Sequence, residues 1–252
     1  MTIRSIYVSL LLLFSNFILA QKIEIGGDWS GIDYMNLCPT YKFSHDGKLN
    51  DPLSILDHNN ISQAKPGSQQ ALAAADYYIK ERGGTDFFDS CKFYDLNVAY
   101  PENLEELKKV NSSYKAENCI AKYYASYIFS PGGDIQYRFG IALDEKFQIV
   151  SEPSFPDIKK RPDSHNMISP EDAYNLALTK QRKLIEDAKT IQLEYDKKRN
   201  SFVWEITGKS VEEPNNKKKE YTHGFVRLNA VTGKIITSCK VTEYHLVNSR
   251  YF

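Results

Sequence analysis

Apolar side chains recur at helical spacing in two separate stretches of the chain. In the first, Gly83 and Gly84 follow an apolar face and predict the end of a helix over residues 68–82. The residues on that face are Ala71, Leu72, Ala75, Tyr78 and Ile79. In the second, Ser169 suits an N-cap and Pro170 the first helical position. The apolar positions that follow there are Ala173, Leu176, Ala177, Leu184 and Ala188.

Each predicted helix is followed by segments in which apolar and polar side chains alternate, as in half-buried strands. After the first helix we expect a strand over Phe87–Tyr100, a short helix over Pro101–Val110, and a hairpin. The hairpin strands cover residues 119–129 and 135–143, on either side of the turn Pro131–Asp134. A short closing strand, Phe147–Val150, completes this series.

The second helix is followed by four predicted strands. These are Ile191–Tyr195, Phe202–Ile206, Tyr221–Leu228 and Lys234–Val241. The last two are separated by Asn229–Gly233, a turn in which Gly233 is available for positive φ. Trp204 shares a face with Phe202 and Ile206, which favours a core position over an exposed ligand platform.

In both stretches a predicted helix is therefore followed by predicted antiparallel strands, and this order predicts an α+β protein. We expect two similar units over residues 68–158 and 165–252, each with one helix packed on an antiparallel sheet. The Pro-containing segment Glu152–Asn166 is the natural linker between them. Residues 21–67 show little periodicity and are rich in Gly, Asp, Asn, Ser and Pro, which predicts a loop-rich N-terminal arm.

The first twenty residues have the pattern of a secretory signal peptide. Arg4 supplies a positive start, an interrupted apolar region follows, and Ala20 is a small residue before a permissible cleavage site. The apolar run is short for a membrane span of ~20 residues, which favours cleavage over the alternative of an uncleaved anchor. We therefore expect an exported protein, periplasmic or extracellular, with no stable membrane span once the leader is removed.

Composition narrows the classes of partner. The chain has 252 residues with 32 basic and 32 acidic side chains, so its formal net charge is zero. That balance gives no electrostatic reason to expect binding to nucleic acid or to an anionic membrane.

Four cysteines lie beyond the predicted leader, and an even number in an exported chain indicates two disulfides. We expect Cys91 to pair with Cys119, because both fall on predicted strands of one meander, which leaves Cys38 to pair with Cys239. The alternative is that all four are buried free thiols. No C-x-x-C motif supports a zinc ribbon or a redox site.

Motifs for catalysis, metals or cofactors are missing from the sequence. The histidines form no close ligand pair, and surface or loop positions are the default expectation for them. They are His45, His58, His165, His223 and His245. No G-x-S-x-G elbow, phosphate loop or dinucleotide fingerprint occurs. We therefore expect no enzyme activity, no cofactor and no metal, unless residues converge from distant segments.

The second stretch resembles the PepSY domain family. The resemblance rests on Ser169–Ala173 at the helix start, on Phe202–Ile206, and on the turn and strand Asn229–Ile236. The same features are similar to a bacterial immunity family with an NTF2-like fold. PepSY modules occur in protease propeptides and envelope proteins and are thought to bind or restrain peptidases, so the resemblance implies a binding module without catalytic residues.

Three functions remain open at this point. The first is a secreted or periplasmic binding module that restrains a peptidase or another protein of the cell envelope. The second is a periplasmic immunity protein of the NTF2-like kind, which would neutralise a toxin. The third is an enzyme whose residues converge only in three dimensions. An NTF2-like protein would have one curved, cone-shaped sheet, whereas the first function predicts two sheet-plus-helix units.

Overall fold

The structure is a computed structural model that describes only part of the chain. The described residues are 24–27, 29–30, 40–44, 59–60, 66–99, 105, 108, 109, 112, 121–131, 136–213 and 219–245. The predicted leader over residues 1–20 lies outside them, as does most of the predicted short helix over 101–110.

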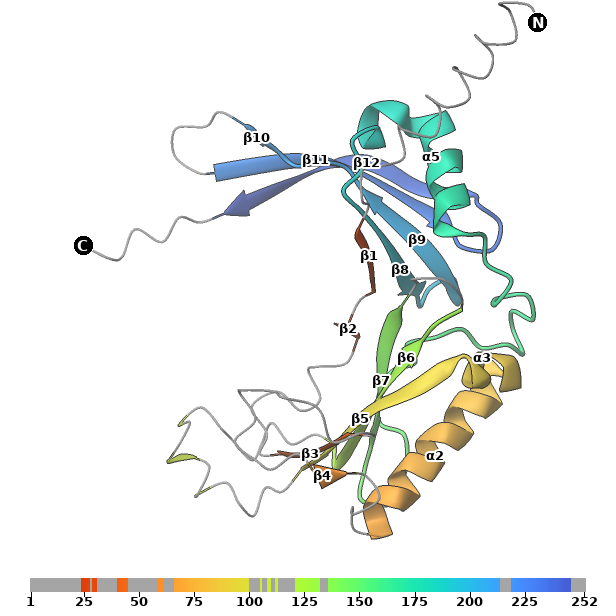
Figure 1. Ribbon diagram of the computed structural model, residues 1–252, viewed down its shortest axis with the longest axis vertical. Coiled ribbons are helices and arrows are strands. Elements are labelled where there is room, and N and C mark those ends of the chain that lie inside the picture. Colours follow the sequence, from red (N-terminus) through yellow and green to blue (C-terminus); the bar gives the residue numbers. More distant parts are fainter. Residues whose placement is uncertain are drawn as a thin grey trace, which may run out of the picture.

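The described strands form two six-stranded sheets, which we call the first sheet and the second sheet (Figure 1). The first sheet has the strand order β2-β7-β6-β5-β3-β4. Its strands are β2 (Trp29–Ser30), β3 (Thr40–Ser44), β4 (Asn59–Asn60), β5 (Cys91–Ala99), β6 (Tyr123–Phe129) and β7 (Tyr137–Leu143). The second sheet has the order β1-β8-β9-β11-β10, with β12 on the other edge of β11. Its strands are β1 (Glu24–Gly27), β8 (Thr190–Asp196), β9 (Ser201–Thr207), β10 (Val211–Glu213), β11 (Lys219–Asn229) and β12 (Ile235–His245).

Each sheet carries its own helix, which confirms the predicted α+β class with two sheet-plus-helix units. Helix α2 (Pro66–Gly83) covers the first sheet and α5 (Pro170–Ile185) covers the second. The two units follow one another along a crescent, with both helices on its outer side (Figure 1).

Helix α2 follows the predicted pattern closely. Ala71, Ala75 and Ile79 are fully buried against the sheet, as their spacing predicts. The Tyr127 hydroxyl on β6 donates a hydrogen bond of 2.7 Å to the Asp76 carboxylate, which fastens the helix to the sheet. Burial raises the pKa of Asp76, although the bond from Tyr127 opposes that shift.

Helix α5 begins as predicted but ends differently. The Ser169 hydroxyl accepts a 3.0 Å hydrogen bond from the Asp172 amide, so the N-cap is confirmed. Gln181 leaves the helical conformation (φ −134°, ψ 33°), and this kink rotates the last turn so that Ile185 is buried. The prediction that Leu176 and Ala188 lie on the buried helical face is wrong. Leu176 is 41% exposed, and Ala188 is buried but follows the helix.

The start of the predicted strand Phe87–Tyr100 is also wrong. Residues Thr85–Asp89 form a short helix, α3, and the strand begins only at Cys91. Gly84, at φ 85°, redirects the chain between α2 and α3. The extra turn places Phe87, which is 1% exposed, in the core instead of on a strand.

Strands from the N-terminal segment were not predicted. β1 pairs in parallel with β8 of the second sheet, and β2 pairs in parallel with β7 of the first. β3 adds an antiparallel strand to β5. The segment predicted as a loop-rich arm therefore contributes strands to both sheets, with β1 in the second sheet and β2 in the first.

The last hairpin of each unit closes with a similar turn, which is one residue longer in the second unit. In the first, Asp144 accepts hydrogen bonds from two amides of the turn, and Phe147 has φ 61°. In the second, Asn229 accepts from two turn amides and Gly233 has φ 65°. The first unit then closes with a single bridge between Leu143 and Ile149, where a short strand was predicted.

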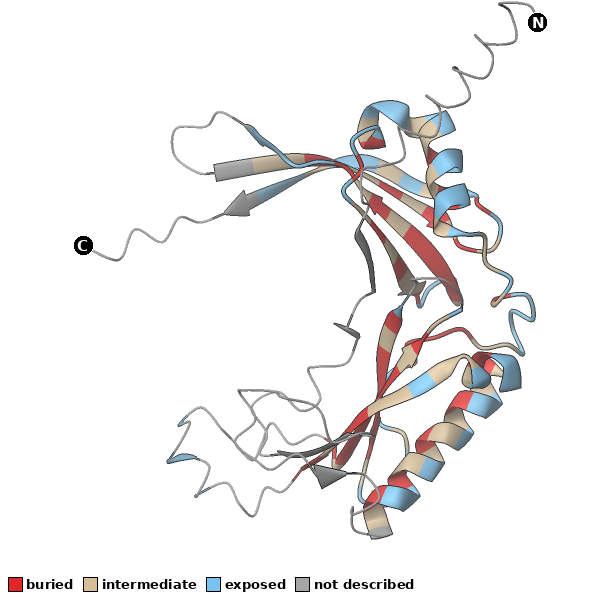
Figure 2. Cartoon of the chain, viewed as in Figure 1, coloured by how far each residue is buried: buried red, intermediate tan, exposed pale blue. Residues whose placement is uncertain are grey.

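Aromatic side chains join the two units. Phe202, at the start of β9, is fully buried and stacks on Phe129 of the first sheet with ring centroids 5.5 Å apart. It also contacts Tyr137 edge-on at 5.2 Å. Phe155 of the linker stacks on Phe87 at 5.1 Å. The buried residues of both sheets consequently form one continuous core at the middle of the crescent (Figure 2).

A polar network on the same junction connects the linker to both units. Arg82, near the end of α2, donates a 2.9 Å hydrogen bond to the Phe155 carbonyl and contacts the Tyr195 hydroxyl at 3.2 Å. Asn200, in the β8–β9 turn, accepts from the Asp157 amide at 2.9 Å. His165 contacts the Gly83 carbonyl through Nε2 at 2.7 Å, and its ring stacks on a phenylalanine of α3.

No helix among the described residues is long and apolar enough to cross a membrane.

We expect Phe202→Ala to destabilise the whole chain by about 3–5 kcal/mol, because it empties a fully buried ring site between the sheets. The measurement is the free energy of unfolding from urea titration followed by circular dichroism. Tyr77→Ala, at a side chain 66% exposed on α2, is the control and should change stability by less than ~0.5 kcal/mol. Equal losses in the two variants would contradict a core shared by both units.

Stability should also depend on pH through His165. Burial lowers the pKa of His165, only partly offset by its bond to Gly83, and its Nδ1 has no hydrogen-bond partner among the described residues. The unfolded chain then binds more protons, so this stabilisation is complete above the ordinary histidine pKa of about 6.5 and is lost as the pH falls toward the lower folded pKa. Urea titrations at several pH values should show a smaller loss at low pH for His165→Gln; an unchanged pH profile would refute the assignment.

Candidate functional site

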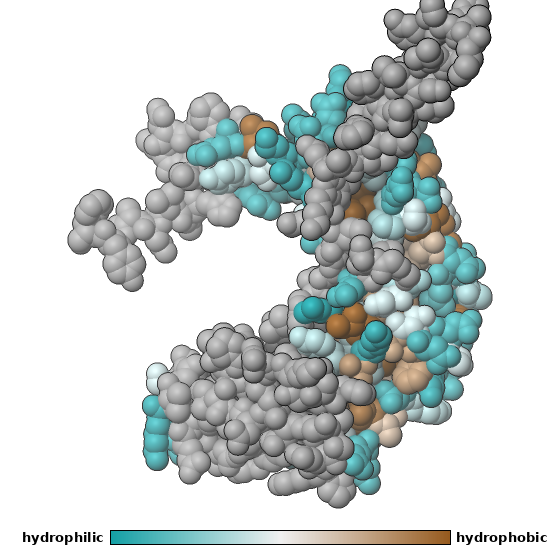
Figure 3. Space-filling view, viewed as in Figure 1, coloured by the Kyte–Doolittle hydropathy of each residue, from teal (hydrophilic) through white to brown (hydrophobic). Residues whose placement is uncertain are grey.

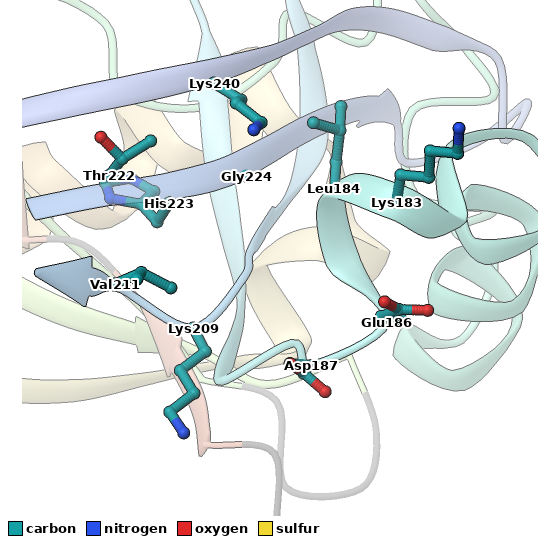
Figure 4. A pocket seen from close by; sticks show the side chains of 10 residues that line it. All are labelled: Lys183, Leu184, Glu186, Asp187, Lys209, Val211, Thr222, His223, Gly224 and Lys240. Carbon is teal, nitrogen blue, oxygen red and sulfur yellow. The ribbon is translucent and has the colours of Figure 1, made fainter. Parts of the chain in front are cut away.

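A cavity of about 290 Å³ lies beside the last turn of α5, over the ribbon of β10, β11 and β12 (Figure 4). We call it the helix-end pocket. It is lined by Lys183, Leu184, Glu186, Asp187, Lys209, Val211, Thr222, His223, Gly224 and Lys240. The surface over this ribbon is mostly hydrophilic (Figure 3).

Two glycines lie under the helix end, and one of them, Gly224, lines the helix-end pocket. Gly208 follows β9 and Gly224 lies on β11, and the Gly208 amide donates a 2.8 Å hydrogen bond to the Gly224 carbonyl. The Leu184 carbonyl of α5 comes so close to both that a Cβ on Gly224 would overlap it. The backbone of the helix end therefore rests directly on the backbone of the sheet, which only glycine permits.

Strand alternation decides which side chains share the pocket's face. Gly224 faces α5, so Thr222, two residues earlier on β11, faces the same way. Lys240 is the register partner of Gly224 on β12, and Thr242 is the partner of Thr222. The hydroxyls of Thr222 and Thr242 lie 3.1 Å apart, so this pair is already hydrogen-bonded.

Charged groups surround the helix-end pocket. Lys183 comes from α5, Lys209 from the bend between β9 and β10, and Lys240 from β12, and all three are exposed. Glu186 and Asp187 follow the helix end. Among the described residues no ion pair within 4.0 Å joins any of the three lysines to either acid. The pocket can therefore offer several ammonium groups to an anionic group on a partner.

The histidines were expected at surfaces or in loops, and the two with described side chains are less exposed than that. His223 is 8% exposed, and alternation along β11 directs its side chain away from the α5 face; its Nδ1 has no partner in the described part of the chain. His165 is half-buried at the junction of the units. His45 and His58 lie outside the described residues, as does the side chain of His245. The described residues contain no group of three or more His, Cys, Asp or Glu side chains that could hold a metal.

The cysteines with described side chains are free thiols here. Cys91 is half-buried, its Sγ donates a 3.2 Å hydrogen bond to the Phe87 carbonyl, and burial raises the pKa of its thiol. Cys239 is exposed on β12. Cys38 and Cys119 lie outside the described residues, so the pairings Cys91–Cys119 and Cys38–Cys239 stay predictions.

Sequence reasoning placed Trp204 correctly but missed the helix-end pocket. Trp204 is fully buried, and its Nε1 donates to the Ile168 carbonyl at 3.2 Å, which confirms it as a core residue. The available signal for the pocket was the pair Gly208 and Gly224, each next to a predicted strand that is otherwise bulky. Glycine in such a position indicates a close approach of another backbone.

Comparison with known proteins identifies one domain. Residues 167–238 match the family model PepSY, described as the peptidase propeptide and YPEB domain. The match covers α5, β8, β9, β10, β11 and the start of β12, and with them every lining residue of the helix-end pocket except Lys240. It confirms the PepSY resemblance for the C-terminal part of the chain. No curated protein and no solved structure matches the chain.

We expect Gly224→Ala to destabilise the second unit by about 1–3 kcal/mol, because the added methyl overlaps the Leu184 carbonyl and forces α5 off the sheet. The measurement is thermal unfolding followed by circular dichroism. Ser210→Ala, at an exposed position between β9 and β10, is the control and should leave the midpoint of thermal unfolding almost unchanged. A Gly224→Ala protein as stable as the parent would show that the helix end does not rest on this glycine.

Proposed function

We propose that this chain is an exported, non-catalytic binding module that restrains a peptidase or another protein of the cell envelope. The observation that carries the proposal is the PepSY match at residues 167–238, in a family whose description names peptidase propeptides. The predicted leader at residues 1–20 supports export.

The arrangement of the sheets favours this function over an immunity protein of the NTF2-like kind. Two separate six-stranded sheets each carry a helix, whereas an NTF2-like protein would have one cone-shaped sheet. The described part of the chain also offers the third alternative, an enzyme with converging residues, little support. The helix-end pocket has lysines, two carboxylates and His223 around an open ribbon, and the hydroxyl of Thr222 is hydrogen-bonded to Thr242 and not to a base.

Restraint by such a module would use folded surface instead of chemistry. Sheet edges, loops and the helix-end pocket would contact the partner, and affinity would come from buried area with a few anchoring side chains. The two disulfides expected from the cysteine count would add rigidity in an oxidising compartment.

The expected result of affinity capture from the envelope fraction is a peptidase, or another envelope protein, recovered with the tagged chain and identified by mass spectrometry. Purified chain should then slow cleavage of a peptide substrate by the captured peptidase in proportion to its concentration. The matched control is the tagged chain unfolded by Phe202→Ala in mild urea. A native chain that repeatedly returns alone, with no peptidase slowed, would contradict the proposed function.

A further inference from the structure

The closing turns place the two units in structural register. Asp144 and Asn229 occupy equivalent positions. The backbone amide of each donates a hydrogen bond to the carbonyl of the residue after the positive-φ residue of its turn. That acceptor is Gln148 after Phe147 in the first unit and Lys234 after Gly233 in the second. Counting back along β7 and β11 from these residues aligns Leu143 with Leu228. Both leucines are fully buried on the helix face of their sheets.

The same count shows where the units differ. Phe139 of β7 aligns with Gly224 of β11, and Tyr137 aligns with Thr222. On the neighbouring strand, Tyr127 is the partner of Phe139 in the first unit, and Gly208 is bonded to Gly224 in the second. Two facing aromatic rings, with centroids 5.6 Å apart, are thus replaced by two glycines.

In the first unit these aromatic positions are where other parts of the chain insert. Phe155 of the linker packs on Phe139 with ring centroids 5.1 Å apart. Phe202 of the second unit packs on Tyr137 at 5.2 Å. In the first unit, the surface formed by these aromatic positions is therefore already a docking surface, and Phe155 and Phe202 of the same chain occupy it. In the second unit the corresponding place is the helix-end pocket, and no described segment fills it.

The charges of the helix-end pocket indicate what could fill it. Lys183, Lys209 and Lys240 come from three different elements and have no acidic partner within 4.0 Å among the described residues. In the view of Figure 4, Lys183 and Lys240 lie on the side of the helix end opposite to Glu186 and Asp187. Three ammonium groups against two carboxylates leave an excess of positive charge, and a partner carboxylate would complement it.

We propose that the helix-end pocket is the docking site for an acidic segment of the partner protein. A carboxylate side chain of that segment enters between Lys183 and Lys240, and its flanking backbone lies across Thr222 and Val211. Val211 is 58% exposed, so the segment would also cover an apolar side chain. This inference rests on the proposed function for the identity of the partner, but not for the existence of the site.

The first experiment uses a defined probe with the full exported chain. The probe is the peptide acetyl-Val-Asp-Val-Asp-Val-amide, and the same peptide with lysine in place of aspartate is its control. Nuclear magnetic resonance of the ¹⁵N-labelled chain should show saturable shifts at the amides of Lys183, Thr222, Gly224 and Lys240 with the acidic peptide only. Equal shifts with both peptides, or shifts elsewhere only, would overturn the proposal.

The second experiment changes the pocket. The double variant Lys183→Glu, Lys240→Glu should weaken binding of the acidic peptide roughly tenfold, because it reverses both charges that face the carboxylate. Lys234→Glu, at an exposed lysine in the closing turn of the same unit, is the matched control and should bind like the parent. Thr222→Tyr places in the pocket the residue that the first unit has there, and should abolish binding while the circular dichroism spectrum is kept.

The two proposals fail in different ways. If a captured peptidase is slowed equally by the parent and by the pocket variants, the docking site is wrong while the proposed function stands. If no envelope protein is captured but the acidic peptide binds and the variants weaken it, the site stands while the proposed function is wrong. An acidic peptide that binds the parent and the double variant with the same affinity refutes the site whatever the capture shows.

Discussion

The insertion of Phe202 into the first unit is the contact on which the rest of the structure depends. The residue belongs to β9, yet it is buried against Phe129 and Tyr137 of the first sheet. Because of this contact, the buried residues of the two sheets form one hydrophobic core that continues across the boundary between the units. A stacked ring at this position also fixes the distance and the angle between the sheets, since aromatic pairs tolerate few geometries.

Polar contacts at the rim of this aromatic cluster make the junction specific. The Arg82 guanidinium donates hydrogen bonds both to the linker and to the second unit. The Asn200 side chain accepts a hydrogen bond from the Asp157 amide and donates one to the Asp157 carbonyl. Asn200 has φ 49°, a conformation that asparagine tolerates better than most residues. Groups that would be costly to bury alone thereby satisfy one another, and the linker is held between the units instead of connecting them loosely.

Much of the fold could be predicted from the sequence, because each helix face and each long strand has a local pattern of its own. The hairpin of β6 and β7, the cap at Ser169 and the turn at Gly233 follow from neighbouring residues alone. Phe87 could not be placed in this way, because its apolar character suits a strand as well as a buried short helix. The N-terminal strands could not be placed either, since β1 and β2 pair with strands more than a hundred residues away, and β3 pairs with a strand more than fifty residues away. The candidate site has the same limitation: Gly208 and Gly224 show their meaning only once Leu184 is seen to rest on them.

The ribbon formed by β11 and β12 has a consequence for motion. Between Gly224 and Lys219 it leaves the cover of α5, and there its only other described strand neighbour is the three-residue β10 (Figure 1). Segments with few buried apolar contacts open at a small free energy, whereas the centre of a shared core opens only with the whole molecule. Amide hydrogens of this ribbon should thus be the first of the second sheet to exchange with solvent, and the ribbon can adjust its twist to a bound surface while the sheets behind it keep their positions.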